Sequence, residues 1–61
     1  MIIKVTNPYW DEEYKVIEDA KYFEKCCENI RAGKEEFIIL HNQDNEIITI
    51  NPRNFASIQI I

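Results

Sequence analysis

Glycine and proline are scarce in this chain, which has one glycine and two prolines among its 61 residues. So few of them leave no room for a flexible linker or a low-complexity segment, and a single domain over residues 1–61 is expected. The lone glycine also excludes the glycine-rich loops that cradle phosphate groups. No apolar run approaches the ~20 residues of a membrane-spanning helix, so the chain is not expected to enter a membrane.

Basic residues are also few, with seven against eleven acidic residues, and they are spread through the chain. The resulting net charge of −4 argues against unspecific attraction to nucleic acid or to an anionic membrane. The first residues lack the pattern of a signal peptide, which predicts a cytoplasmic protein. Twelve isoleucines and six asparagines beside three alanines indicate a preference for AT-rich codons, which favours a bacterial or phage origin.

Motifs for catalysis or metal binding are missing as well. Cys26 and Cys27 are adjacent, whereas zinc sites use spaced ligands, and the only further candidate is His41. Neighbouring residues on a helix point about 100° apart, which makes an intrachain disulfide between these cysteines unfavourable. We expect both thiols to be reduced, with Cys27 in the core. The sequence therefore predicts no enzyme, no metal site and no cofactor.

One helix is clearly indicated over Asp19–Ala32. Asp19 suits the position that caps the start of a helix, and Gly33 suits a left-handed stop. Apolar residues within this segment recur at spacings of three and four, which places them in one stripe along the helix. The stripe consists of Ala20, Phe23, Cys27 and Ile30.

The C-terminal third, Phe37–Ile61, has three short runs of β-branched and aromatic residues separated by turn residues, which predicts an antiparallel meander. Two further strands before the helix are expected to form a hairpin. The chain is thus predicted to be an α+β domain of order β-β-α-β-β-β, with the helix on an antiparallel sheet that is either open or barrel-like. The expected strands are Ile2–Thr6, Tyr14–Glu18, Phe37–His41, Glu46–Ile50 and Ser57–Ile61.

The pairing of the first two meander strands follows from a turn centred on Gln43 and Asp44. The expected pairs are His41 with Glu46, Ile39 with Ile48 and Phe37 with Ile50. Because side chains alternate across a sheet, this register places one apolar set on each face. We assign the helix to the face with Phe37, Ile39, Ile48 and Ile50, and we expect Ile58 and Ile60 of the last strand to join it.

The other face of this pair carries Ile38, Leu40 and Ile47 and cannot be covered by the same helix. It could be closed by curling of the sheet into a partial barrel or by a second copy of the chain. A domain of this size has a thin core, so we favour the second copy. The sequence therefore predicts a homodimer with an interface formed by Ile38, Leu40 and Ile47.

An acidic and aromatic segment follows the first strand and supports two interpretations. In one it is a hairpin loop whose Trp10 folds over one end of the core. In the other it is a contact surface for a basic protein partner, since tryptophan and tyrosine are enriched in binding hot spots. The candidate surface consists of Tyr9, Trp10, Asp11, Glu12, Glu13 and Tyr14.

These features favour a small non-enzymatic interaction or regulatory module that acts through protein contacts and self-associates. An alternative is a small β-sheet protein that binds nucleic acid through Tyr9, Trp10, Tyr14, Arg53 and nearby lysines. The net charge counts against this alternative.

Overall fold

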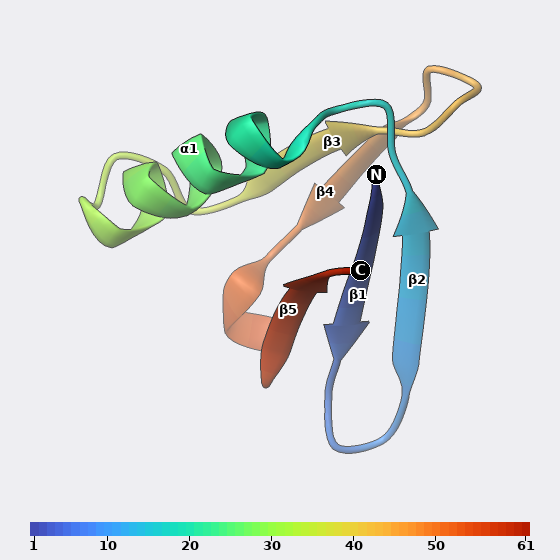
Figure 1. Cartoon of the computed structure of the whole chain (residues 1–61). Coiled ribbons are helices and arrows are strands. Elements are labelled where there is room, and N and C mark those ends of the chain that lie inside the picture. The colour runs from blue at the N-terminus through green and yellow to red at the C-terminus, as the bar shows by residue number, and fades with distance from the viewer.

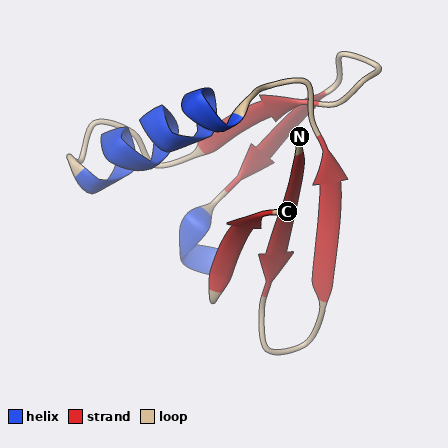
Figure 2. Cartoon of the chain, in the orientation of Figure 1, coloured by secondary structure: helices blue, strands red, loops and turns tan.

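The computed structural model describes residues 1–61 and contains five strands, one α-helix and a short 3₁₀ helix (Figures 1 and 2). The elements confirm the predicted α+β class and the order β-β-α-β-β-β. They are β1 (Ile2–Thr6), β2 (Asp11–Lys15), α1 (Ala20–Arg31), β3 (Ile38–His41), β4 (Ile47–Ile50), η1 (Pro52–Asn54) and β5 (Ser57–Ile60).

The N-terminal hairpin is present, but β2 begins three residues earlier than predicted. The reason lies in the turn, where the side-chain oxygen of Asn7 accepts hydrogen bonds from the N–H groups of Tyr9 and Trp10. The Asn7 N–H in turn donates to the Trp10 carbonyl at 3.0 Å. Pairing therefore starts immediately with Thr6 opposite Asp11, and the acidic residues that were expected in a loop enter the strand.

The C-terminal meander is not formed as predicted, because β5 pairs with β1 and not with β4. The connection turns at Asn51, whose side-chain oxygen accepts the N–H of Arg53, and continues through η1. This turn carries the chain away from β4 to the free edge of β1, as Figure 1 shows. The result is a three-stranded antiparallel sheet of order β2-β1-β5 and a separate antiparallel pair, β3-β4.

The register of the β3-β4 pair differs from the prediction by one residue. Ile38 lies opposite Ile50 and Leu40 opposite Ile48. The turn is longer than expected because Asn42 accepts the N–H groups of both Asp44 and Glu46 through its side chain. The positive φ of 62° at Asn45 closes the loop.

This shift exchanges the two faces of β3, because adjacent residues of a strand point to opposite sides. The β4 residues keep their predicted faces, with Ile48 and Ile50 turned toward the core. Ile38 and Leu40 now join them there, while Phe37 and Ile39 point outward. The assignment of the helix to a face carrying Phe37 and Ile39 was therefore wrong.

The helix α1 begins and ends as predicted. Asp19 caps its first turn by accepting the N–H of Tyr22, and Gly33 follows its end with a φ of 76°. Phe23 is its buried residue, Cys27 and Ile30 are partly buried, and Ala20 is exposed. Three of the four residues of the predicted stripe therefore face the core.

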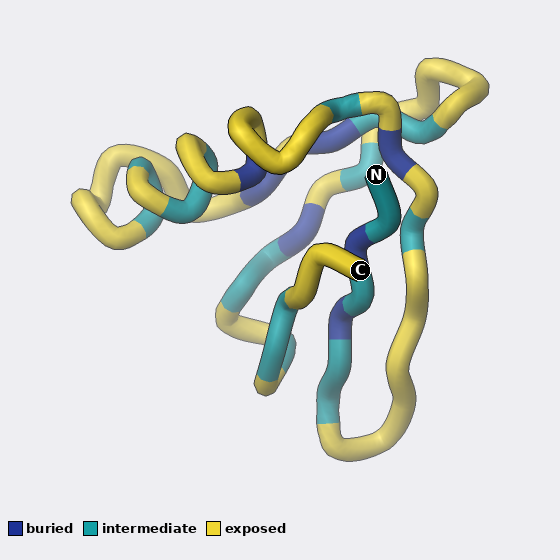
Figure 3. Tube along the Cα trace, in the orientation of Figure 1, coloured by how far each residue is buried: buried dark blue, intermediate teal, exposed yellow.

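The core lies between the two sheets and α1, and Figure 3 shows the buried positions along β1, β3 and the facing side of α1. One backbone hydrogen bond, from Ile17 to the His41 carbonyl, joins the end of the N-terminal hairpin to β3. The sheets do not otherwise close, so the barrel-like alternative is not realised. The core residues are Ile3, Val5, Val16, Phe23, Ile38, Leu40 and Ile50.

Candidate interaction surface

The residues predicted to form the self-association interface do not share a surface. Ile38 and Leu40 are only 1% and 0% exposed and belong to the core, whereas Ile47 is 69% exposed. The one-residue shift of the β3-β4 register is the cause. This correction removes Ile38 and Leu40 from any contact surface of the folded chain.

An open apolar face nevertheless exists on the other side of the same hairpin. Phe37 and Ile39 are 46% and 47% exposed there, and Ile47 lies on the same side. We call this surface, formed by Phe37, Ile39 and Ile47, the outer hairpin face. Its position follows from alternation, since the neighbours of these residues along the strands point into the core.

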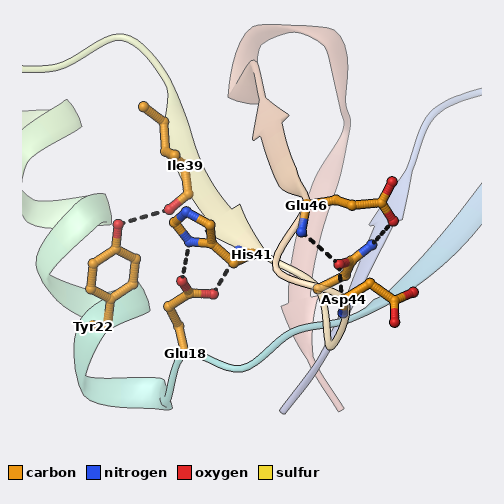
Figure 4. A network of polar contacts seen from close by, with 7 residues as sticks. Glu18, Tyr22, Ile39, His41, Asp44 and Glu46 are labelled. Atoms are coloured by element: carbon orange, nitrogen blue, oxygen red, sulfur yellow. Dashed lines mark hydrogen bonds and ion pairs between the residues drawn. The ribbon is translucent and has the colours of Figure 1, made fainter.

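The helix α1 lies beside the outer hairpin face and does not cover it. The Tyr22 hydroxyl donates a 2.7 Å hydrogen bond to the carbonyl of Ile39, which fixes the first turns of the helix against β3 (Figure 4). Burial raises the pKa of Tyr22, and so does the neighbouring thiol of Cys26, which keeps the hydroxyl a donor. A groove of about 200 Å³ separates helix and strand. It is lined by Tyr22, Lys25, Cys26, Asn29, Glu35, Phe37 and Ile39.

The acidic and aromatic residues of the second candidate surface are divided between two faces of β2. Asp11 and Glu13 point to the side of Lys4, and the Asp11 carboxylate lies 3.7 Å from the Lys4 ammonium group. Glu12 and Tyr14 point to the opposite side, where the Tyr14 hydroxyl donates to the Glu12 carboxylate at 3.0 Å. Burial raises the pKa of Tyr14, and the hydrogen bond to Glu12 adds to this effect. The six residues therefore form no single contact face.

The tip of this hairpin holds the two remaining aromatic residues in different environments. Tyr9 is almost fully exposed, whereas Trp10 is 47% exposed and meets Phe55 edge to face, with ring centres 5.8 Å apart. Phe55 itself packs against the core. This arrangement agrees with the interpretation in which Trp10 folds over one end of the core.

A polar cluster that the sequence did not reveal lies where the two sheets meet (Figure 4). The Glu18 carboxylate accepts the backbone N–H of His41 at 2.8 Å, and its second oxygen lies 2.7 Å from the ring Nδ1. Burial raises the pKa of Glu18, but these hydrogen bonds outweigh burial and leave it below its ordinary value. His41 was expected to face Glu46, which instead binds the Asn42 side chain at 2.8 Å.

These contacts satisfy backbone groups along the edge of β3 that does not pair with β4. Ile17 donates to the His41 carbonyl, Glu18 accepts the His41 N–H, and Tyr22 donates to the carbonyl of Ile39. Unpaired strand edges invite pairing with other chains, and side chains that occupy their donors and acceptors prevent it. The cluster therefore occupies the outer edge of β3. The imidazole ring of His41 is hydrogen-bonded to Glu18, which gives this histidine a structural role.

The two cysteines are free and partly buried. Burial raises the pKa of the Cys27 thiol, and the nearby Arg31 guanidinium only partly opposes this, so the thiolate is disfavoured. No group of three or more histidine, cysteine, aspartate or glutamate side chains is placed to hold a metal ion. None of the helices combines the length and the apolar character needed to cross a membrane.

Comparison of the chain with protein-family models, with curated proteins and with solved structures found no match. The geometry of the surfaces described above is therefore the basis for a function.

Proposed function

We propose that this protein is a non-enzymatic interaction module that self-associates through its outer hairpin face. The observation that carries the proposal is the exposure of Phe37, Ile39 and Ile47 on one side of a two-stranded sheet. Contiguous exposed apolar patches are uncommon on monomers and mark contact sites. A two-stranded hairpin with one uncovered face also gains stability when that face is packed.

A second copy of the chain is the partner that suits this face. The chain carries a net charge of −4, yet none of the residues of β3 and β4 is acidic or a lysine or arginine. Two copies can therefore place apolar side chains against each other with no like charges from these strands between them. Such an isologous contact would also enlarge a core that has only seven buried residues.

Nucleic-acid binding receives less support. Two of its three candidate aromatic residues have contacts within the chain, since Trp10 packs against Phe55 and the Tyr14 hydroxyl donates to Glu12, and only Tyr9 is almost fully exposed. Stacking on bases requires exposed aromatic faces next to basic residues. Arg53 lies in η1 and not on the hairpin that carries the three aromatic residues.

Sedimentation equilibrium of the wild type and of Ile47→Lys tests the proposal. The wild type is expected to be a dimer at micromolar concentration, and Ile47→Lys a folded monomer, because the lysine places a charge in the contact. Ile61→Lys is the matched control, since Ile61 is 64% exposed but follows β5 in the other sheet. A well-folded wild-type monomer over a wide concentration range contradicts self-association.

A further inference from the structure

The outer edge of β5 has backbone groups without partners. In an antiparallel pair, alternate residues direct their N–H and C=O groups toward the neighbouring strand. The Ile61 N–H donates to the Ile2 carbonyl. Every second residue before Ile61, namely Gln59 and Ser57, therefore also directs its backbone N–H and C=O groups toward β1. Ile58 and Ile60 therefore point their backbone groups away from β1, and no further strand pairs with them.

The strands β2, β3 and β4 also have edges that no other strand pairs with, but these edges are less suited than that of β5 to the addition of a strand. The edge of β2 carries Asp11, Glu13 and Lys15, and charged residues of this kind discourage strand addition. The edge of β3 is occupied by the cluster around Glu18. The edge of β4 is uncharged, but none of the grooves of the structure is lined by a β4 residue. The edge of β5 is both uncharged and next to a groove.

This groove lies between the helix α1 and the end of β5 and has a volume of about 430 Å³. Apolar side chains from both elements line it, and it falls in the size range of ligand sites, about 300–1,000 Å³. One wall is thus a helix with apolar side chains, and the other is the end of β5, the strand whose outer edge has the free N–H and C=O groups of Ile58 and Ile60. The lining residues are Phe23, Glu24, Cys27, Glu28, Arg31 and Ile60.

The charges along the helical wall give the groove a direction. Glu24 lies two helical turns before Arg31, so one end of the wall is acidic and the other basic. Glu28 is 3.9 Å from the Lys25 ammonium group in an exposed pair, whereas Glu24 has no ion-pair partner. An acidic side chain without a partner at one end favours a ligand with a positive charge there.

We propose that the groove binds an extended peptide segment of another protein, which adds as a strand to the edge of β5. This proposal rests on one part of the proposed function, namely that the protein acts by binding other proteins, and it does not require self-association. A polypeptide in the β conformation presents donors and acceptors at the spacing of every second residue, which matches Ile58 and Ile60. Its inward side chains are apolar and lie against Phe23 and Cys27, and a lysine or arginine reaches Glu24.

The test is a titration of the ¹⁵N-labelled protein, followed by NMR, with a short acetylated and amidated peptide of alternating valine and threonine that contains one lysine. The amide signals of Ile58 and Ile60 are expected to shift together with those of Phe23 and Glu24. The same peptide N-methylated at the amides that face β5 is expected to lose binding, because it can no longer donate to the edge. Equal binding of both peptides, or shifts that spare Ile58 and Ile60, overturns the proposal.

A protein variant provides the complementary test. Ile60→Pro removes an N–H that points away from β1, and proline is tolerated at such edge positions. It is expected to abolish peptide binding, and if it fails to fold, the N-methylated peptide decides. If Ile60→Pro instead lowers the sedimentation mass of the protein, a second copy occupies the edge and the peptide proposal is wrong.

The two proposals fail independently of each other. The monomeric variant Ile47→Lys is expected to bind the peptide as the wild type does, because Ile47 lies outside the groove. Undiminished peptide binding by a wild-type monomer would contradict self-association alone. An intact dimer that does not bind the peptide would overturn the groove proposal alone.

Discussion

Glu18 and His41 are 23 residues apart in the chain and are joined by two contacts to one carboxylate. One oxygen accepts the backbone N–H of His41, and the other lies 2.7 Å from its ring. Next to them, the Ile17 N–H donates to the His41 carbonyl. These contacts attach the connection between β2 and α1 to the end of β3, at the place where the two sheets meet.

Glu18→Gln is expected to lower the free energy of unfolding by about 1.5–3 kcal/mol, the range for hydrogen bonds that involve a charged group. The amide keeps an oxygen for the His41 N–H but cannot be an anionic partner for the ring. Urea denaturation measures the change. Glu36→Gln is the control, because Glu36 is exposed, has no hydrogen bond through its side chain and should change stability by less than about 0.5 kcal/mol. Equal effects of the two substitutions would contradict a stabilising role for Glu18.

The stability of the protein should also depend on pH through Glu18. Burial raises the pKa of Glu18, but the hydrogen bonds with His41 lower it by more than burial raises it. The pKa of Glu18 is therefore lower in the folded protein than in the unfolded chain. The unfolded chain therefore binds more protons in the acid range, and the contribution of Glu18 is complete above about pH 4.3. It is lost as the pH falls through the folded pKa. Urea midpoints measured between neutral pH and about pH 3 should fall more steeply for the wild type than for Glu18→Gln, and parallel curves contradict this.

The corrected register of the β3-β4 pair predicts opposite outcomes for two similar substitutions. Leu40→Asp buries a charge with no partner in the core and is expected to prevent folding. Ile47→Asp places the same charge on an exposed side chain and should leave the fold intact. Circular dichroism and the dispersion of amide NMR signals distinguish the two. A folded Leu40→Asp protein would mean that β3 presents its other face to the core.

Phe23→Ala removes the buried residue of α1 and should destabilise the protein by about 3–5 kcal/mol. For a small domain this is close to complete unfolding. Tyr22→Phe, on the adjacent position, removes only the hydroxyl that donates to Ile39 and should cost about 1 kcal/mol. Thermal melting followed by circular dichroism ranks the two variants, and an unchanged melting temperature for Phe23→Ala would refute the packing of α1 described above.

The fluorescence of Trp10 depends on its contact with Phe55 at one end of the core. Because its ring is half covered and meets Phe55, its fluorescence should be intermediate between that of a buried and that of an exposed tryptophan. Phe55→Ala is expected to shift the emission to the red and to increase quenching by acrylamide. Phe37→Ala, on the outer hairpin face, should leave both unchanged. Identical spectra for the wild type and Phe55→Ala would contradict the contact between Trp10 and Phe55.

Elements with strong local signals could be predicted closely from the sequence. The helix agrees with the prediction because Asp19 and Gly33 mark its ends, and β1 agrees because it is rich in β-branched residues, with Ile3 and Val5 on the buried face. The strand β2 was misplaced because Asp11, Glu12 and Glu13 have low strand propensity. Only the turn at Asn7 and the pairing with β1 bring these acidic residues into a strand.

Local sequence signals were sufficient to place the helix and most of the strands, and to show that both faces of the β3-β4 hairpin are apolar while a single helix covers only one of them. Both depend on the local order of apolar and polar residues. Which residues form that face was decided by the Asn42 turn, because one extra loop residue exchanges the faces of β3. The partner of β5 was decided by the free edge of β1, and the partner of His41 by the approach of Glu18. Such choices depend on which edges and polar groups meet in space, and no local pattern of residues records that.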